Sequence, residues 1–262
     1  MASVDKSIHS AASGVAAETA AKHSKPASNG LVFYSGWFCP FVARVWIALE
    51  EKGIDYEYRE INPYKKEAHF LAINPKGLVP AVEHDGAAMY ESLVLLEYLE
   101  ETFPSTAPLF PSKNTARAHV RMHIDQVVKK IMPSFYKTLQ AQQEEEQKEA
   151  RKTLTAAFKE YAEAFPNSSK PFHGGDKPDA VDVALAPWAC RLFLLEEHRG
   201  GPFQAAEVGE AFIKWRKAIQ DWPSVKAVLS TPEKYTEVYQ RYLNDEAMSE
   251  AAKATRSGGV IP

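Results

Sequence analysis

Apolar and polar positions follow two different patterns along this chain, one over residues 30–106 and another after them. The first pattern predicts a strand, a helix and a strand at 31–34, 40–52 and 55–61, then a polar helical stretch, two strands and a helix at 64–73, 79–84, 87–90 and 92–103. Asp85-Gly86 joins the last two strands and favours a tight hairpin, because glycine accepts a positive φ at little cost. We therefore expect a βαβ unit followed by a ββα unit.

An apolar stripe at helical spacing marks the helix at 40–52. Its members are Val42, Val45, Trp46 and Leu49. Arg44 falls on the other, polar face of this helix, together with Glu50 and Glu51. Pro40 suits the first turn, where a missing N–H costs no hydrogen bond, and Gly53 is expected just past the end.

The second pattern, over residues 113–247, is helical in period and contains no convincing strand. Its clearest helix begins at Asp179. The spacing of Asp179 and Asp182 is that of a capping box, in which each carboxylate accepts a hydrogen bond from the backbone N–H of the other residue. The linker before this region is rich in proline, at Pro104, Pro108 and Pro111. We expect an all-helical domain here.

Both ends of the chain look loose. Residues 1–29 are rich in Ala, Ser and Lys and poor in large apolar side chains, so they are expected to be a flexible tail. Residues 248–262 are expected to be a second tail. The first segment lacks the apolar centre of a secretory signal and the arginines of a transit peptide, which favours a cytoplasmic location.

Composition limits the function classes. The chain has 262 residues, 45% of them hydrophobic, and a formal net charge of −3, so it lacks the concentrated basic surface that a nucleic acid needs. No apolar run is long enough to span a bilayer, and two cysteines cannot make a disulfide framework. His119 and His123 are spaced i, i+4 as in some metal sites, but no third ligand is evident and we expect no metal.

Cys39 stands where the predicted first strand turns into the following helix. The unpaired N–H groups and the positive dipole end of a helix favour a thiolate, so we expect a lowered pKa and a nucleophile. A buried, inert cysteine remains the alternative from this segment alone. Val42 occupies the position where two-cysteine thiol enzymes carry their second cysteine, so redox chemistry here needs an external thiol.

A second motif, Asn74-Pro-Lys-Gly-Leu-Val79-Pro80, directly precedes a predicted strand. A cis Val79–Pro80 bond would leave the backbone N–H and C=O of Val79 exposed to an extended peptide. Further on, Glu91 and Ser92 open a helix whose first N–H groups and serine hydroxyl can seat a carboxylate. Taken singly, each of these residues also suits an ordinary turn or helix cap.

Ser-Gly-Trp-Phe-Cys39-Pro40-Phe41, the Val79-Pro80 motif and Tyr90-Glu91-Ser92 together resemble the glutathione transferases, and Cys-Pro-Phe is similar to their omega class. The resemblance implies an α/β plus all-α fold, with a thioredoxin-like βαβαββα domain followed by an all-helical domain. It also implies glutathione as co-substrate, a mixed disulfide on Cys39, and a homodimer. Around glutathione it places Phe41 beside the thiol, Lys66 near the glycine carboxylate, Val79 and Pro80 at the cysteinyl backbone, and Glu91 and Ser92 at the γ-glutamyl end.

For the second substrate, the same resemblance places five residues across a cleft from the thiol. These are Trp188, Arg191, Tyr235, Tyr239 and Tyr242. The three tyrosines also have the spacing of an ordinary packed helix, and the family often has tryptophan where Tyr235 stands. The nearby Cys190 is expected to be an inert core thiol.

The activities that the resemblance implies are deglutathionylation and dehydroascorbate reduction, with small electrophilic or glutathionylated molecules as second substrates. Reductive removal of glutathione from hydroquinone or aryl-ether adducts is an alternative that uses the same thiol. A protein that binds glutathione or apolar ligands without turnover is the alternative from another class.

Overall fold

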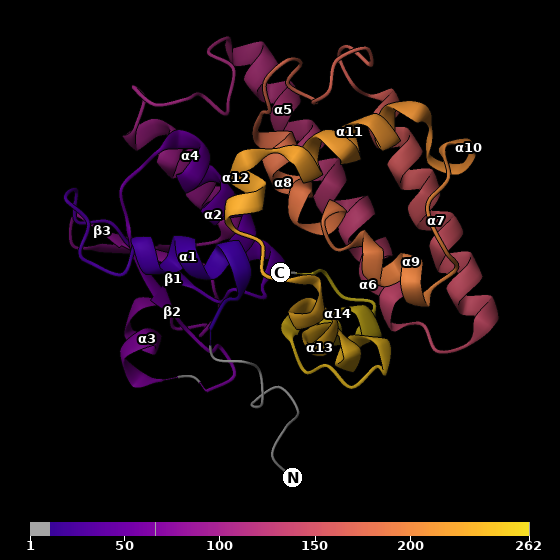
Figure 1. Cartoon of the computed structure of the whole chain (residues 1–262), viewed down its shortest axis with the longest axis horizontal. Coiled ribbons are helices and arrows are strands. Elements are labelled where there is room, and N and C mark those ends of the chain that lie inside the picture. The colour runs from indigo at the N-terminus through magenta and orange to yellow at the C-terminus, as the bar shows by residue number, and fades with distance from the viewer. Residues whose placement is uncertain (1–10, 66, 262) are drawn as a thin grey trace.

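The computed structural model describes residues 11–65 and 67–261. A four-stranded sheet of order β2-β1-β3-β4 forms the first half of the molecule (Figure 1). Strand β1 runs parallel to β2 and antiparallel to β3, and β3 runs antiparallel to β4. The elements of this half are β1 (Val32–Ser35), α2 (Pro40–Lys52), β2 (Glu57–Glu60), α3 (Ala68–Ile73), β3 (Ala81–His84), β4 (Ala87–Tyr90) and α4 (Ser92–Thr102). Their order confirms the expected thioredoxin-like fold.

Local signals in the sequence agree with the local structure. Asp85 and Gly86 have φ angles of 52° and 75°, so the expected tight hairpin joins β3 and β4. Pro40 lies in the first turn of α2, and Gly53 ends that helix in the left-handed conformation with a φ of 62°. The Val79–Pro80 peptide bond is cis, as predicted.

Helix α2 is buried on most of its surface, including part of the face that the sequence pattern predicted to be polar. The stripe of Val42, Val45, Trp46 and Leu49 lies in the core as expected. Arg44, expected on the polar face, is only 1% exposed. Its side chain meets α8 of the second domain, where Nε donates to the Ala184 carbonyl at 2.9 Å. Packing between the domains therefore covers a face that would be exposed in the first domain alone.

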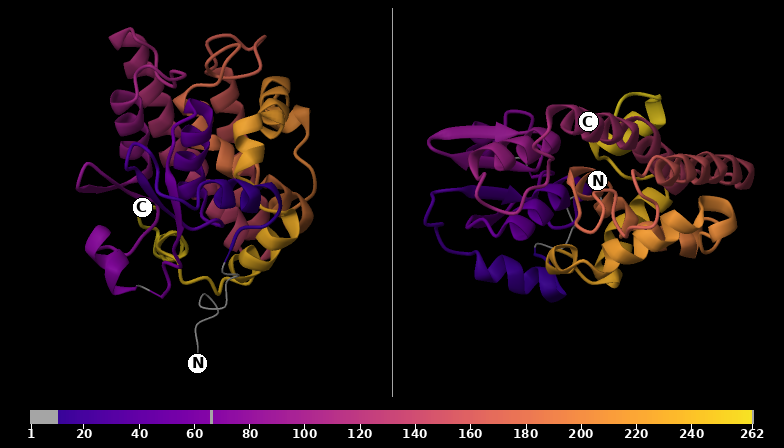
Figure 2. Two further views of the ribbon diagram at one scale, coloured as in Figure 1. Left: turned by 60° about the vertical axis from the view of Figure 1, so that its left-hand side comes forward. Right: turned by 90° about the horizontal axis from the view of Figure 1, so that it is seen from above.

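The second half of the molecule is helical, as expected, and lies beside the sheet domain (Figure 2). Helix α8 is at its centre, and Asp179 and Asp182 form the predicted capping box at its start. The elements here are α5 (Asn114–Gln126), the π-helical segment η2 (Val127–Ile131), α6 (Met132–Gln140), α7 (Glu144–Glu163), α8 (Ala180–Ala189), α9 (Leu192–His198), α10 (Ala205–Val208), α11 (Glu210–Asp221), α12 (Pro223–Ala227) and α13 (Pro232–Leu243).

The expectation of a flexible tail over residues 1–29 is wrong for its described part, residues 11–29. Helix α1 (Gly14–Lys22) packs against α12 of the helical domain. Thr19 donates a hydrogen bond to the Ala227 carbonyl at 2.7 Å, and His23 stacks on Tyr56 of the sheet domain at 3.8 Å between ring centroids. Small side chains such as Ala16 allow this close packing, so low hydrophobicity did not mean disorder.

The expectation of a tail at 248–262 is also wrong for its described part, residues 248–261. Helix α14 (Glu250–Ser257) packs against α6, and Ser249 caps it by accepting a hydrogen bond from the Ala252 N–H at 3.0 Å. Figure 1 shows α13 and α14 together at the lower edge of the helical domain. The segment therefore belongs to the folded molecule, because an alanine-rich face is enough to dock a short helix.

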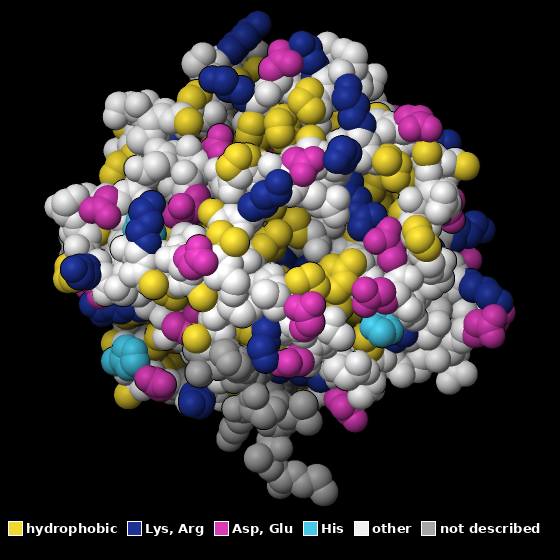
Figure 3. Space-filling view, viewed as in Figure 1, with side chains coloured by type: hydrophobic (Ala, Val, Ile, Leu, Met, Phe, Trp, Pro, Cys, Tyr) yellow, Lys and Arg dark blue, Asp and Glu magenta, His cyan; other side chains and the backbone are white. Residues whose placement is uncertain are grey.

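The surface carries both signs of charge. On the face shown in Figure 3, Lys and Arg side chains are interspersed with Asp and Glu side chains. Among the described helices, none has the length and apolarity needed to cross a membrane.

Candidate active site

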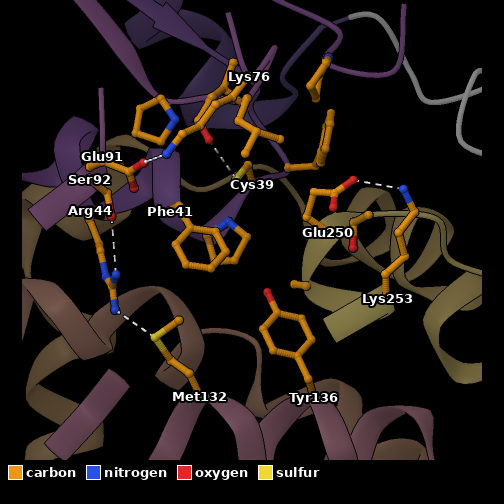
Figure 4. Close-up of a pocket in the computed structure, with 18 of the residues that line it drawn as sticks. Cys39, Phe41, Arg44, Lys76, Glu91, Ser92, Met132, Tyr136, Glu250 and Lys253 are labelled. Atoms are coloured by element: carbon orange, nitrogen blue, oxygen red, sulfur yellow. Dashed lines mark hydrogen bonds and ion pairs between the residues drawn. The ribbon is translucent and has the colours of Figure 1, made fainter. Parts of the chain in front are cut away.

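A cleft of about 330 Å³ lies between the two domains. Cys39, the cis-proline loop and the start of α4 line one wall, and helices α6, α13 and α14 line the other. Figure 4 shows Cys39 and Phe41 facing Tyr136 across this space, with Glu250 and Lys253 at one side. The cleft therefore joins Cys39, the Val79-Pro80 loop and the Glu91-Ser92 turn of the sheet domain to side chains of the helical domain.

Cys39 caps the N-terminus of α2 in an extended conformation. Its thiol lies 3.8 Å from the Val79 carbonyl oxygen, to which it can donate a weak hydrogen bond. The backbone N–H groups of Phe41 and Val42 face the sulfur and favour its thiolate. The strand-to-helix junction thus places the thiol where the sequence predicted it.

The predicted lowering of the thiol pKa is wrong. Burial raises the pKa of Cys39 and outweighs the lowering by the N–H groups of Val42 and Phe41 and by the charges of Arg191 and Arg44. Part of the cysteine surface still faces the cleft, so water reaches the residue. The resting site therefore favours a protonated thiol surrounded by groups that stabilise the thiolate once it forms.

Two buried arginines flank the thiol. Arg191 Nη2 donates to the carbonyl of Phe38 at 3.3 Å, and its Nη1 donates to the carbonyl of Pro187 at 2.6 Å. Arg44 reaches the other side of the site from α2. No carboxylate of the described residues forms an ion pair with either guanidinium, so both leave positive charge near the cleft.

The cis-proline loop supplies an exposed backbone edge. Val79 and Pro80 line the cleft, while the paired part of strand β3 begins only at Ala81. No backbone hydrogen bond occupies the Val79 N–H within the described part of the chain. An extended peptide could therefore pair with Val79 by main-chain hydrogen bonds.

The start of α4 brings polar and charged side chains to the cleft. Glu91 has a φ of 78°, unusual for a residue other than glycine, and precedes Ser92 at the first turn. Arg44 Nη1 donates to the Ser92 hydroxyl at 3.3 Å, and Lys76 Nζ lies 2.6 Å from a Glu91 carboxylate oxygen. A ligand with both an amine and a carboxylate would find partners of both signs here.

The structure separates the residues expected around the second substrate. Tyr239 and Tyr242 line the cleft. Trp188, Arg191 and Tyr235 do not line it and lie in the core behind it, where the Arg191 guanidinium sits 4.5 Å from the Tyr235 ring centroid. Phe41 lines the cleft and contacts Trp188 edge-on, so Trp188 supports the site from behind. Lys66 lies outside the described residues.

Other cleft residues were missed by the sequence analysis. Lys76 and Arg44 were placed in a turn and on a polar face, although each has a basic side chain close to a predicted motif. Tyr136 and Met132 come from α6, and no local motif marks them. The side of the cleft formed by α14 was assigned to a tail. Of these residues, only Lys76 and Arg44 carried a signal in the sequence, a basic side chain close to a predicted motif.

Of the two histidines spaced i, i+4, His123 has a structural role and His119 is exposed. His123 hydrogen-bonds His173 through their ring nitrogens at 2.5 Å, and His173 bonds Asp179 of the α8 capping box at 2.8 Å. Within residues 11–65 and 67–261, no group of three potential metal ligands comes together.

Comparisons with known proteins agree with this geometry. Residues 33–107 match the family described as glutathione S-transferase, N-terminal domain. Mouse glutathione S-transferase omega-1 is 32% identical over 81% of this chain and 85% of its own length. The crystal structure of glutathione transferase Omega 3C from Trametes versicolor is 44% identical, with a TM-score of 0.83 over 91% of this chain and 100% of that chain. A rice glutathione transferase solved in complex with glutathione is 29% identical, with a TM-score of 0.73 over 83% of this chain and 98% of its own. The chain therefore belongs to the omega class of the glutathione transferases.

Proposed function

We propose that this glutathione transferase acts as a glutathione-dependent thiol transferase, with deglutathionylation and dehydroascorbate reduction as its activities. The observation that carries the proposal is a single cysteine at the N-terminus of α2, Cys39, which lies on a cleft and has Val42 where a resolving cysteine would stand. A cysteine of this kind bonds covalently to glutathione and must borrow a second thiol from solution.

The proposed reaction has two thiol exchanges. The Cys39 thiolate attacks the glutathione sulfur of a mixed disulfide, and the other sulfur leaves as a thiolate. Free glutathione, as its thiolate, then attacks the Cys39–glutathione disulfide, so that glutathione disulfide leaves and Cys39 returns to its reduced form. Arg191, Arg44 and the first N–H groups of α2 stabilise the thiolate in both steps, because all of them place positive charge toward the sulfur.

Glutathione would be held along the wall formed by the sheet domain. Val79 and Pro80 offer the backbone edge for its cysteinyl part, and Glu91 and Ser92 offer a carboxylate and a hydroxyl for its γ-glutamyl end. Phe41 packs beside the thiol, and Lys66 keeps its proposed role at the glycine carboxylate. The rice relative was solved in complex with glutathione, which supports this choice of co-substrate.

Enzyme assays can distinguish the proposed function from two rival functions. Reductive removal of glutathione from hydroquinone or aryl-ether adducts requires the same thiol, whereas a binding protein requires none. We would test purified protein with a glutathionyl disulfide, with dehydroascorbate and with glutathionyl hydroquinones, and compare Cys39→Ala with Cys190→Ala. Loss of disulfide reduction in Cys39→Ala alone is the expected result, because Cys190 does not line the cleft. Turnover that survives in Cys39→Ala would refute the proposal.

A homodimer and a cytoplasmic location are part of the same proposal. Val94 on α4 and Met122 on α5 are the large apolar side chains exposed on these two helices, which are joined by ion pairs from Glu97 to Arg117 and Arg121. An exposed apolar pair on adjoining helices suits a contact between two copies. The two free cysteines suit a reducing compartment.

A further inference from the structure

A carboxyl group outside the cleft holds the loop that carries the thiol. Glu60 ends strand β2 and, in the parallel register of the sheet, lies opposite Ser35 at the end of β1. Its Oε1 atom accepts a hydrogen bond from the Trp37 N–H at 3.0 Å. Trp37 belongs to loop 36–38, which joins β1 to Cys39 at the start of α2. Glu60 itself does not line the cleft, so it meets the site through this loop.

Loop 36–38 is held at several of its peptide groups. The Gly36 carbonyl accepts a hydrogen bond from the Cys39 N–H at 2.8 Å. The Phe38 carbonyl accepts one from Arg191 Nη2 at 3.3 Å. Together with the bond to the carboxyl group, these contacts set the direction in which the chain enters α2. The place of the sulfur follows from that direction, because Cys39 is the cap residue of the helix.

The carboxyl group of Glu60 is itself fixed. The Tyr58 hydroxyl donates a hydrogen bond to its Oε2 atom, so each oxygen has a donor. Burial raises the pKa of Glu60 to about 7, so the ionised and the protonated forms are both present near neutral pH. Either form keeps an acceptor oxygen for the Trp37 N–H. The length of the side chain, rather than its charge, therefore decides whether this hydrogen bond forms.

A second glutamate of the sheet offers a comparison. Glu83 on β3 is also partly buried, and it too accepts a hydrogen bond from a tyrosine hydroxyl, that of Tyr34, at 3.1 Å. The partner of Glu83 is a side chain of β1, whereas the Oε1 atom of Glu60 bonds the backbone of the loop. The two glutamates share their chemistry, and the contact with the loop distinguishes them.

We propose that Glu60 is a positioning residue for Cys39, which it serves by fixing the loop through the Trp37 N–H. This inference rests on the proposed function only in taking Cys39 as the nucleophile. Without the hydrogen bond, loop 36–38 can shift, and the sulfur moves away from the first N–H groups of α2. Those N–H groups favour the thiolate, so attack by Cys39 becomes slower. Glutathione affinity should change little, because the cis-proline loop and the start of α4 are separate segments.

Two substitutions separate the reach of this side chain from its charge. Glu60→Asp keeps the carboxylate but is one methylene shorter, which draws the oxygens back from the Trp37 N–H by about 1.5 Å. Glu60→Gln keeps the length and an acceptor oxygen, and its amide group can donate to the Tyr58 hydroxyl. Both substitutions are made in Cys190→Ala protein, in which Cys39 is the only thiol.

Alkylation of the thiol by iodoacetamide at pH 8 measures its reactivity without turnover. Glu60→Asp should lower the second-order rate constant about tenfold, as expected for one lost hydrogen bond. Glu60→Gln should stay within about twofold of the parent protein. The dissociation constant for S-methylglutathione should change by less than about twofold in both variants, whereas a general loosening of the site would weaken binding as well.

Glu83→Asp is the matched control and should leave the rate constant within about twofold of the parent. Tyr58→Phe gives a second test if Glu60→Asp does not fold, because it removes the donor that orients the carboxyl group; it should slow alkylation about threefold. Unchanged rate constants in Glu60→Asp and Tyr58→Phe would overturn the inference. So would a Glu60→Gln rate as low as that of Glu60→Asp, or an equal loss in Glu83→Asp. Failure of the proposed function appears separately, as wild-type protein that is alkylated at Cys39 but does not reduce glutathionyl disulfides.

Discussion

At Cys39 two local effects oppose each other. The N–H groups at the start of α2 favour the thiolate, and the burial of the residue opposes it. Burial prevails, so the free enzyme should hold mostly thiol at neutral pH. The sequence could predict the helix end but not the depth of the residue below the surface, which depends on the second domain.

The first prediction concerns the pH dependence of thiol transfer. Because the pKa of Cys39 is raised, the rate constant for attack at low substrate concentration should rise with pH beyond the ordinary thiol pKa of about 8.5. Absorbance of the thiolate at 240 nm should rise over the same pH interval. The titration should be repeated in Cys190→Ala, since burial raises the pKa of that second thiol to about 11. A Cys39 titration complete below pH 7 would contradict the prediction.

The second prediction concerns Cys39→Ser. A hydroxyl cannot form a disulfide with glutathione, but it can hydrogen-bond a bound glutathione thiolate. Disulfide reduction should fall at least about a hundredfold, while conjugation of a chlorinated nitroaromatic compound should increase relative to wild type. Both activities are measured on the same preparation, together with the dissociation constant for glutathione. Retained disulfide reduction would show that another group is the nucleophile, and lost glutathione binding would show that the site is misassigned.

Among the elements, α1 gives the clearest difference between sequence and structure. It connects the two domains, through Thr19 to α12 and through His23 to the sheet domain. Its composition is that of a loose segment, and its stability comes from docking rather than from its own apolar content. A short helix of this kind is recognisable only once the surface that receives it is known.

The third prediction uses two neighbouring residues of α1. Ala16 is fully buried and Val15 is 50% exposed, so an aspartate at position 16 would bury a charge, whereas one at position 15 would face water. Ala16→Asp should lower the free energy of unfolding by about 2 kcal/mol or release α1, and Val15→Asp should change it by less than about 0.5 kcal/mol. Urea unfolding and limited proteolysis measure both effects. Equal behaviour of the two variants would show that α1 does not dock.

At the scale of the whole molecule, we expect stability to depend on Glu60, a partly buried carboxyl group that accepts a hydrogen bond from the Trp37 N–H. Burial raises the pKa of Glu60 to about 7, although hydrogen bonds from the Tyr58 hydroxyl and from the Trp37 N–H, at 3.0 Å, oppose the rise. Since the folded state holds this proton more tightly than the unfolded chain, stability should fall as pH rises from about 4.5 to about 7.

The fourth prediction is that Glu60→Gln removes this pH dependence. The free energy of unfolding of the variant should match that of wild type at pH 4.5 and exceed it by about 2 kcal/mol at pH 8. This difference is smaller than the full rise in the Glu60 pKa would give, because Glu60 retains some exposed surface. Urea unfolding of both proteins at the two pH values gives the comparison. A difference that does not grow with pH would contradict the raised pKa.

The fifth prediction concerns assembly. If the exposed Val94 and Met122 lie in a contact between two copies, Val94→Asp combined with Met122→Asp should shift the protein from dimer to monomer. Sedimentation velocity at micromolar concentration would detect the change. Val15→Asp serves as the control, because it alters an exposed apolar residue on a different helix. A wild-type monomer, or a dimer unaffected by both aspartates, would refute this contact.

The sequence alone determined the features that depend on neighbouring residues. The strands and helices of the first domain, the turn at Asp85-Gly86, the capping box at Asp179 and Asp182, and the thiol at a helix start were all predicted. Each follows from periodicity, φ preference or first-turn hydrogen bonding within a few residues. The motifs of the sheet domain also identified one wall of the cleft.

Only the tertiary structure decided which residues the two domains bring together. In the folded molecule Arg44 is buried and Tyr136 lies opposite Cys39. Trp188, Arg191 and Tyr235 lie behind the cleft, and α1 and α14 pack against the helical domain. The tertiary structure also raised the pKa of the thiol, because desolvation depends on all the atoms that surround a group in space. These contacts join segments far apart in the chain, and a local pattern carries no information about what will cover it.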